Sequence, residues 1–268
     1  MAQITVAVSG GSGRMGRAVV EAVLSAPDLR LATVLEQKGN PSIGRDAGEL
    51  AGSPCGVRIG DDVANSIRGA DVFVDFTRPE GTVAHLAACR KQGVNMVIGT
   101  TGFGEAQKKE IAAAARDIAI VLSPNFSVGV TVAFRLLEVA AGALGKGYDV
   151  EILEAHHRLK VDAPSGTALR MGEVVAQALG RNLGQSAVYG REGVTGERKD
   201  DTIGFATVRG GDLVGDHSVM FIGTGERLEV THRSASRANY ATGALRAARF
   251  VLSKQNGLYD MADVLGFK

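Results

Sequence analysis

The sequence has almost no net charge, few cysteines and no long apolar run, and each shortage excludes a class of protein. The 268 residues carry 30 Lys and Arg against 29 Asp and Glu, which argues against a nucleic-acid-binding protein or one held to a membrane by a basic surface. No apolar run reaches the roughly eighteen residues that span a bilayer, and the chain does not open on a basic segment followed by an apolar one. We therefore expect a soluble protein without a cleaved leader.

The two cysteines, Cys55 and Cys89, lie far apart in the sequence and form no Cys-x-x-Cys pair. Such sparse thiols favour a reduced, cytoplasmic protein, and a disulfide between them is the alternative. The adjacent histidines His156 and His157 would point apart in an extended strand, and no further Cys or His accompanies them at the spacing of metal ligands. We expect no metal site.

The first half of the chain alternates apolar runs with helical patterns. Strands are expected at residues 4–9, 29–36, 71–77, 94–100 and 118–123, and helices at 14–25, 80–93 and 105–117. Strands that alternate with helices predict right-handed crossovers and a parallel sheet. The uninterrupted apolar run at 4–9 is typical of a strand buried on both faces. We expect an α/β fold whose first domain is Rossmann-like and binds a dinucleotide.

The second half follows a different pattern. A helix is expected at 130–144, and the segment 202–234 predicts consecutive strands joined by glycine-containing turns, an antiparallel arrangement. From residue 236 the helical period returns, and we expect this last helix to pack on the first domain. The predicted division is therefore 1–126 with 237–268 for the dinucleotide-binding domain and 127–236 for a smaller α+β substrate domain.

The stretch "GGSGRMG" places Gly10, Gly13 and Gly16 between a strand and a helix. In a dinucleotide site, such glycines make the tight turn, let the backbone approach the pyrophosphate and pack the helix on the sheet. A turn that simply needs glycine is the alternative. Glu36, at the end of the second strand, favours the dinucleotide site because its carboxylate can bind a ribose diol.

The residues around Glu36 bear on the choice of cofactor. A carboxylate acceptor favours NAD, whereas the 2′-phosphate of NADP needs an Arg or Lys. Gln37 follows Glu36, and Lys38 and Arg14 could each supply a cation. We expect a preference for NADH or the use of both cofactors.

A second candidate site is "EAHHRLKVDAPSGTAL", residues 154–169. In an extended strand, His156, Arg158 and Lys160 would share a face and His157 would point the other way. In a helix, His156 and Lys160 would also share a face, four residues apart. Either geometry puts a proton donor beside a cation that can hold an anion. Surface histidines and a solvated lysine are the alternative.

A helix is expected to begin just downstream, with Asp162 or Ser165 as its N-cap and Pro164 near its first turn. Backbone N–H groups around Gly166 and Thr167 could then bind a carboxylate. The other three histidines receive no role: His85 is expected to be structural, and His217 and His232 lie among the strands.

The chain resembles the bacterial 4-hydroxy-tetrahydrodipicolinate reductase family over nearly its whole length. The motifs that carry this resemblance are "GGSGRMG", "DFTRPEGT", "VIGTTGF", "NFSVGV", "EAHHRLKVDAPSGTA", "TIGFATVRGGD" and "GERLEVTHRSASR". The resemblance implies NADH- or NADPH-dependent reduction of a cyclic dicarboxylate on the diaminopimelate route to lysine. It also implies a homotetramer assembled through the second domain.

The resemblance assigns roles to individual residues. His156 is implied as the catalytic acid and Lys160 as its cationic partner. The implied substrate contacts are His157, Ser165, Gly166, Thr167 and Arg237. The implied cofactor contacts are Gly10, Gly11, Ser12, Gly13, Arg14, Met15, Glu36, Gln37, Arg78, Gly99, Thr100, Thr101, Ser123, Pro124, Asn125 and Phe126.

This chain departs from the family's pattern at two of these positions. Gln37 stands where many members carry Arg, which weakens the case for NADPH, and Pro124 cannot donate an N–H. Two other functions stay open. A semialdehyde dehydrogenase is disfavoured because the 154–169 segment has no cysteine. A dinucleotide sensor would keep the glycines and Glu36 but would not need His156 and Lys160.

Overall fold

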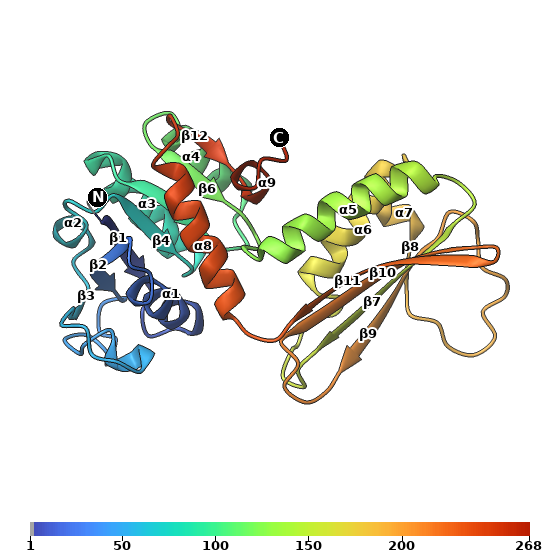
Figure 1. The fold of residues 1–268 in the computed structure, drawn as a ribbon, viewed down its shortest axis with the longest axis horizontal. Helices are drawn as coiled ribbons and strands as arrows, with labels where there is room; N and C mark the ends of the chain where they lie inside the picture. Colours follow the sequence, from blue (N-terminus) through green and yellow to red (C-terminus); the bar gives the residue numbers. More distant parts are fainter. Residues whose placement is uncertain (1–2) are drawn as a thin grey trace. The chain divides into compact units, whose positions relative to one another are not determined.

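The computed structural model describes residues 3–268, which form two compact units (Figure 1). The first unit ends at residue 128 and resumes at 237–268, and the second comprises 129–236. The boundaries expected from the sequence fall at 126 and 236. Within the described residues, no helix combines the length and apolar character needed to cross a membrane.

The first unit is built on a parallel sheet, as predicted, and this sheet has seven strands instead of the five expected. The strands follow the order β12-β6-β5-β4-β1-β2-β3. Their bounds are β1 Ile4–Ser9, β2 Leu29–Leu35, β3 Ile59–Gly60, β4 Val72–Asp75, β5 Asn95–Ile98, β6 Ala119–Leu122 and β12 Gly257–Tyr259. The sequence did not predict β3 and β12, because two or three residues carry no periodic signal.

Helices cover both faces of this sheet. They are α1 Arg14–Leu24, α2 Val63–Ser66, α3 Pro79–Gln92, α4 Glu105–Ala114, α8 Ala238–Val251 and α9 Met261–Val264, with a 3₁₀ turn at Glu49–Ala51. Adjacent residues of β4 enter different cores: Val74 packs with α1 and α8, and Phe73 packs with α3 and α4. This alternation explains why the predicted strands read as continuous apolar runs. The returning helix α8 packs on the first unit, as expected.

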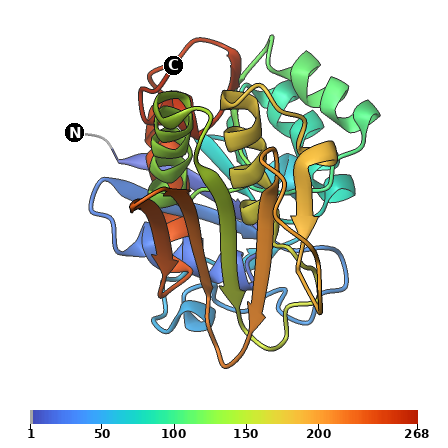
Figure 2. The same cartoon turned by 90° about the vertical axis from the view of Figure 1, so that its right-hand side faces the viewer.

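The second unit contains a five-stranded mixed sheet, which Figure 2 shows face on. Its order is β11-β10-β7-β9-β8, with β7 Asp149–His156, β8 Ala187–Tyr189, β9 Ile203–Arg209, β10 Gly215–Gly223 and β11 Glu226–Ser234. Strand β10 is antiparallel to β7 and β11, whereas β9 is parallel to β7 and β8.

The expectation of consecutive antiparallel neighbours is wrong for β9 and β10, since β7 lies between them. The connection that joins them is bonded to the end of β7. Gly210 N donates to His156 O (3.0 Å) and His157 N donates to Leu213 O (2.8 Å). The short glycine-containing segment therefore crosses the end of a third strand instead of making a hairpin.

One face of this sheet is covered by α5 Val128–Leu144 and α6 Gly166–Ala178, with α7 Leu183–Ser186 nearby. The core joins Leu137 and Met171 of these helices to Ile152 and Phe205 of the strands. The opposite face carries exposed apolar side chains, with Leu153 at 38% of its surface exposed. Period-two alternation thus divides β7 and β10 between a packed face and an open one.

Candidate active site

The glycine loop between β1 and α1 is a tight turn that leaves no room for a side chain at Gly16. Gly10 has a φ of +68°, and its oxygen accepts a hydrogen bond from Gly13 N at 2.9 Å. A Cβ on Gly16 would lie 2.0 Å from that same oxygen. Gly13 is the N-cap of α1, so the first N–H groups of the helix face the loop. This backbone cradle at a helix N-terminus is suited to an anion.

Glu36 lies beside the loop, where the sequence predicted it. Its Oε1 accepts hydrogen bonds from Ser12 N (2.8 Å) and Ser12 Oγ (2.6 Å), and its Oε2 accepts from Asn40 Nδ2 (3.0 Å). The carboxylate is therefore oriented by the loop itself. Asn40 was not predicted, because no motif marks a residue four positions after Glu36. Gln37 and Lys38 follow as exposed residues.

A cavity of about 270 Å³ opens in the first unit. It is lined by Met15, Phe76, Gly99, Pro124, Asn125, Phe126 and Tyr240. The rings of Phe76 and Phe126 lie edge to face, with their centroids 5.4 Å apart. The structure brings five of the predicted cofactor residues together here, and it adds Phe76 and Tyr240, which the sequence did not single out.

The remaining predicted cofactor residues of the first unit lie on nearby strand ends and loops. Arg78 is the exposed N-cap of α3, and Thr101 is exposed. The Thr100 hydroxyl is buried and accepts a hydrogen bond from Thr82 Oγ1 at 2.8 Å. Ser123 Oγ donates to Asn125 O at 2.8 Å, which shapes the turn after β6.

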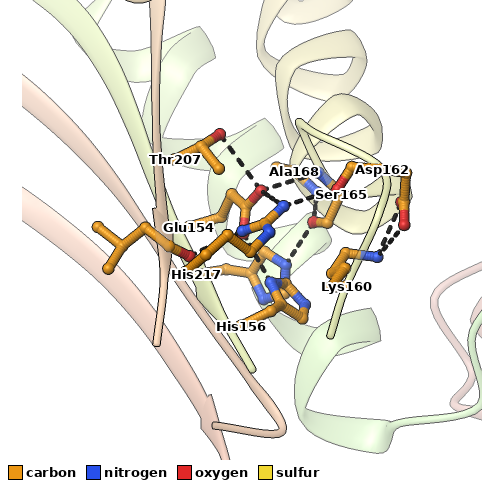
Figure 3. Close-up of polar contacts among 10 residues, drawn as sticks. Glu154, His156, Lys160, Asp162, Ser165, Ala168, Thr207 and His217 are labelled. Atoms are coloured by element: carbon orange, nitrogen blue, oxygen red, sulfur yellow. Dashed lines mark hydrogen bonds and ion pairs between the residues drawn. The ribbon is translucent and has the colours of Figure 1, made fainter. Parts of the chain in front are cut away.

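In the second unit, His156 ends β7 and is 8% exposed. Its Nδ1 lies 2.6 Å from Oε2 of Glu154, a carboxylate that is 1% exposed (Figure 3). Arg209 of β9 binds the same carboxylate from two nitrogens, Nη1 to Oε2 at 2.7 Å and Nη2 to Oε1 at 2.8 Å. A buried carboxylate needs such partners, because an unpaired buried charge is strongly unfavourable.

These contacts decide the charge of Glu154. Burial pushes the pKa of this carboxyl upward, but hydrogen bonds from Arg209 and His156 outweigh burial and hold the pKa below its usual value. Glu154 is therefore ionised at neutral pH. Its role was not predicted from the sequence, although residues two apart on a strand share a face.

The chain turns sharply after β7. Lys160 N donates to His157 O at 3.1 Å, which closes a turn. The expectation that 154–160 continues as a strand, or becomes a helix, is wrong because the backbone groups of 156–158 are bonded to the 210–213 connection. Lys160 Nζ pairs with both oxygens of Asp162, at 2.7 and 2.8 Å. Asp162 thus pairs with Lys160 and is not the N-cap of α6.

Ser165 is the N-cap of α6, one of the two candidates from the sequence. Its Oγ accepts from Ala168 N at 3.1 Å, and its own N donates to Glu154 Oε1 at 3.1 Å. The Ser165 hydroxyl also lies 2.8 Å from His217 Nε2. Gly166 and Thr167 form the first turn of the helix, immediately after the Ser165 cap.

His217 of β10 belongs to this cluster, although the sequence gave it no role. It is 4% exposed, and its ring lies edge to face with that of His156, with centroids 5.1 Å apart. Burial, followed by repulsion from His156, lowers the pKa of His217 to about 4. Its imidazole is therefore neutral at pH 7. Its place beside His156 depends on strand pairing across 61 residues of sequence, which no local motif reports.

His85, expected to be structural, pairs with a buried acid in the first unit. Its Nδ1 lies 2.7 Å from Oδ2 of Asp75, while Oδ1 accepts from Thr77 N and Oγ1 at 2.9 and 2.6 Å. Arg237 lies at the N-cap of α8. Across the described chain, no three His, Cys, Asp or Glu side chains gather in a way that could hold a metal ion.

Comparison with known proteins gives consistent similarities over the whole length. Residues 4–126 match the family model of the dihydrodipicolinate reductase N-terminus, and residues 129–265 match that of its C-terminus. A 4-hydroxy-tetrahydrodipicolinate reductase of Nitrosomonas europaea is 62% identical over 268 residues, all of both chains. Another, from Cupriavidus necator, is 61% identical over 99% of this chain and all of its own.

A solved structure is also similar. It is the dipicolinate-bound dihydrodipicolinate reductase from Paenisporosarcina sp. TG-14, with a TM-score of 0.78 and 26% identity. The match covers 97% of this chain and 98% of that one.

Proposed function

This chain belongs to the dihydrodipicolinate reductase family, and we propose that His156 is its proton donor and Lys160 the cation that holds its substrate. The reaction is the NAD(P)H-dependent reduction of 4-hydroxy-tetrahydrodipicolinate to tetrahydrodipicolinate, in diaminopimelate and lysine biosynthesis. The observation that carries the assignment of roles is the cluster of His156, Lys160 and the α6 N-terminus.

The first unit fits a dinucleotide. The glycine loop leaves no room for a side chain at Gly16, and Glu36 is already held toward the loop by Ser12. We propose that the loop, from Gly10 through Gly11, Ser12, Gly13 and Arg14 to Met15, holds the pyrophosphate, and that Glu36 and Gln37 contact the ribose. When bound, the reduced nicotinamide supplies the hydride.

We assign the 270 Å³ cavity to the nicotinamide end of the cofactor. Three aromatic rings and a methionine give it apolar walls, while backbone groups of the turns after β5 and β6 supply polar contacts. The residues that we propose there are Gly99, Thr100, Thr101, Ser123, Pro124, Asn125 and Phe126, with Arg78 along the cofactor. Pro124 contributes its ring and its oxygen, since it has no N–H.

The substrate is a small cyclic dicarboxylate, and the relative from Paenisporosarcina is described as dipicolinate-bound. We propose that one carboxylate lies at the N-terminus of α6, against Ser165, Gly166 and Thr167. Lys160 contacts the same group by turning from Asp162, an exposed partner that a carboxylate can replace. His157 and Arg237 complete the proposed substrate contacts.

His156 is suited to proton transfer to the reduced product. Its Nδ1 is bound to Glu154, so the other ring nitrogen, Nε2, is the one available to a substrate. Transfer of a proton from Nε2 to the carbanion or enamine left by reduction completes the reaction. Glu154 and Arg209 hold the ring in place during this step.

The function is tested by the loss of absorbance of NADH and, separately, NADPH when the purified protein meets freshly made product of dihydrodipicolinate synthase. We expect oxidation of both that depends on this substrate, with the larger kcat/KM for NADH, since Gln37 gives no cation for a 2′-phosphate. A clear preference for NADPH would refute the interpretation that Gln37 favours NADH. Binding of NADH without turnover would favour the dinucleotide sensor instead.

We also propose a cytoplasmic homotetramer. The open face of the second sheet exposes Leu153 and Val208, at 38% and 46% of their surfaces, and apposed sheets would cover them. Sedimentation at micromolar concentration should give about four times the chain mass of 27.8 kDa. A monomer under those conditions would contradict the proposal.

The two cysteines, Cys55 and Cys89, are free thiols, so the alternative of a disulfide between them is wrong.

A further inference from the structure

Glu154 is the most highly connected side chain of the second unit's cluster. It is buried on β7, and its two oxygens accept hydrogen bonds from five groups. These donors are Arg209 Nη1 and Nη2, His156 Nδ1, Ser165 N and Thr207 Oγ1, the last at 3.3 Å. They come from strands β7 and β9 and from the cap of α6 (Figure 3). Such a carboxylate sets the relative positions of everything bound to it.

The first consequence concerns the tautomer of His156. An ionised carboxylate can only accept a hydrogen bond, so the ring nitrogen that faces it, Nδ1, must carry a hydrogen. Within the described residues, Nε2 makes no hydrogen bond. A Cβ on Gly215 would lie 3.0 Å from Nε2, so glycine at this position of β10 leaves that nitrogen uncovered. Glu154 thereby makes Nε2 the atom that gains and loses the proton.

The second consequence concerns the start of α6. Ser165 N donates to Glu154 Oε1 at 3.1 Å, and Ser165 Oγ caps the helix by accepting from Ala168 N. One carboxylate therefore fixes both the acid and the helix N-terminus that is proposed to bind the substrate. A displacement of Glu154 would move both together.

Arg209 holds Glu154 in this role. Its guanidinium binds the carboxylate with two parallel hydrogen bonds, the arrangement that best orients a carboxylate. Arg209 Nη2 also donates to Asp162 O at 2.7 Å, which fixes the segment that carries Lys160. The pair thus connects β9, β7 and the turn after β7.

We propose that Glu154, with Arg209 as its counter-ion, is the positioning residue that selects the tautomer of His156 and aligns it with the α6 N-terminus. This role rests on the proposed function of His156. The ionisable groups that face His156 are Glu154 from β7, Arg209 from β9, His217 from β10, backed by His232 of β11, and Lys160 with Asp162 from the following turn. Of these, Glu154 alone is hydrogen-bonded to the ring.

The test is the pH profile of kcat for Glu154→Gln, with kcat and KM for NADH measured beside it. The amide keeps the shape but loses the charge that stabilises the protonated ring. We expect kcat at neutral pH to fall at least about 10-fold, and the alkaline limb of the profile to move to lower pH, since the protonated ring loses the negative charge hydrogen-bonded to it. KM for NADH should stay unchanged.

Glu151→Gln is the matched control, because Glu151 lies on the opposite face of the same strand and is paired with Arg191 and Arg198. It should leave the alkaline limb in place. If Glu154→Gln does not fold, Glu154→Asp keeps the charge but shortens the side chain, and it should lower kcat with little movement of the limb. Wild-type kcat in Glu154→Asp would then overturn the positioning role.

The outcomes separate this inference from the function on which it rests. Wild-type protein that fails to oxidise NADH and NADPH with the substrate would refute the proposed function. Active wild type and inactive His156→Gln, together with an unaltered kcat and pH profile in Glu154→Gln, would refute the role of Glu154 alone.

Discussion

The His156→Gln variant should lose about 10²- to 10⁴-fold in kcat at neutral pH, the range that a general acid contributes. Glutamine can still reach Glu154 with its amide, so the buried carboxylate keeps a donor and the local fold persists. It cannot give up a proton at neutral pH, so protonation of the reduced product must rely on water. Steady-state kinetics with NADH and fresh substrate measure the loss.

Two further measurements make the His156 result specific. The melting temperature and the Kd for NADH should match those of the wild type, because His156 belongs to the second unit and the glycine loop to the first. A kcat within threefold of the wild type would remove His156 from the chemistry. A drop in melting temperature of about 10 °C would assign it a structural role instead.

The sequence predicted the members of the site that stand close together in the chain, and it missed those brought together by strand pairing. His156, Lys160 and Ser165 lie within ten residues, where spacing and cap chemistry are informative. Arg209 is 55 residues from Glu154, and Ser165 is 52 residues from His217. No local pattern links such pairs, because the strands that pair with β7 are determined by the packing of the whole sheet.

The fold was predictable to a similar degree. The parallel sheet of the first unit follows from apolar runs that alternate with helices, since only burial on both faces allows such runs. The order of the second sheet was not predictable, because the sequence pattern marks β9 and β10 as strands but does not say which neighbour each takes. Hydrogen bonds from the 210–213 connection to β7 settle that order in the structure.

Gly16→Ala should nearly abolish binding of NADH. The new Cβ would lie 2.0 Å from Gly10 O and 2.6 Å from Gly10 C, and backbone atoms cannot move aside as a flexible side chain would. The loop must open, which separates the N–H groups of the loop from those of α1 that together face an anion. We expect the Kd for NADH to rise at least about 100-fold, with a loss of roughly 2 kcal/mol in the free energy of unfolding from overpacking.

A graded series separates the cofactor role from a purely structural one. Gly13→Ala should weaken NADH binding less, because its Cβ would lie 3.1 Å from Gly10 O, and Gly104→Ala, 3.8 Å from the nearest atom, should change neither property. Both glycines have φ of −74°, which alanine adopts without strain. If Gly16→Ala lowers stability but binds NADH with the wild-type Kd, the glycines serve only the turn. The anion site would then have to lie elsewhere in the first unit. Binding that weakens in the order of the three distances, measured by calorimetry, would instead assign the loop to the cofactor.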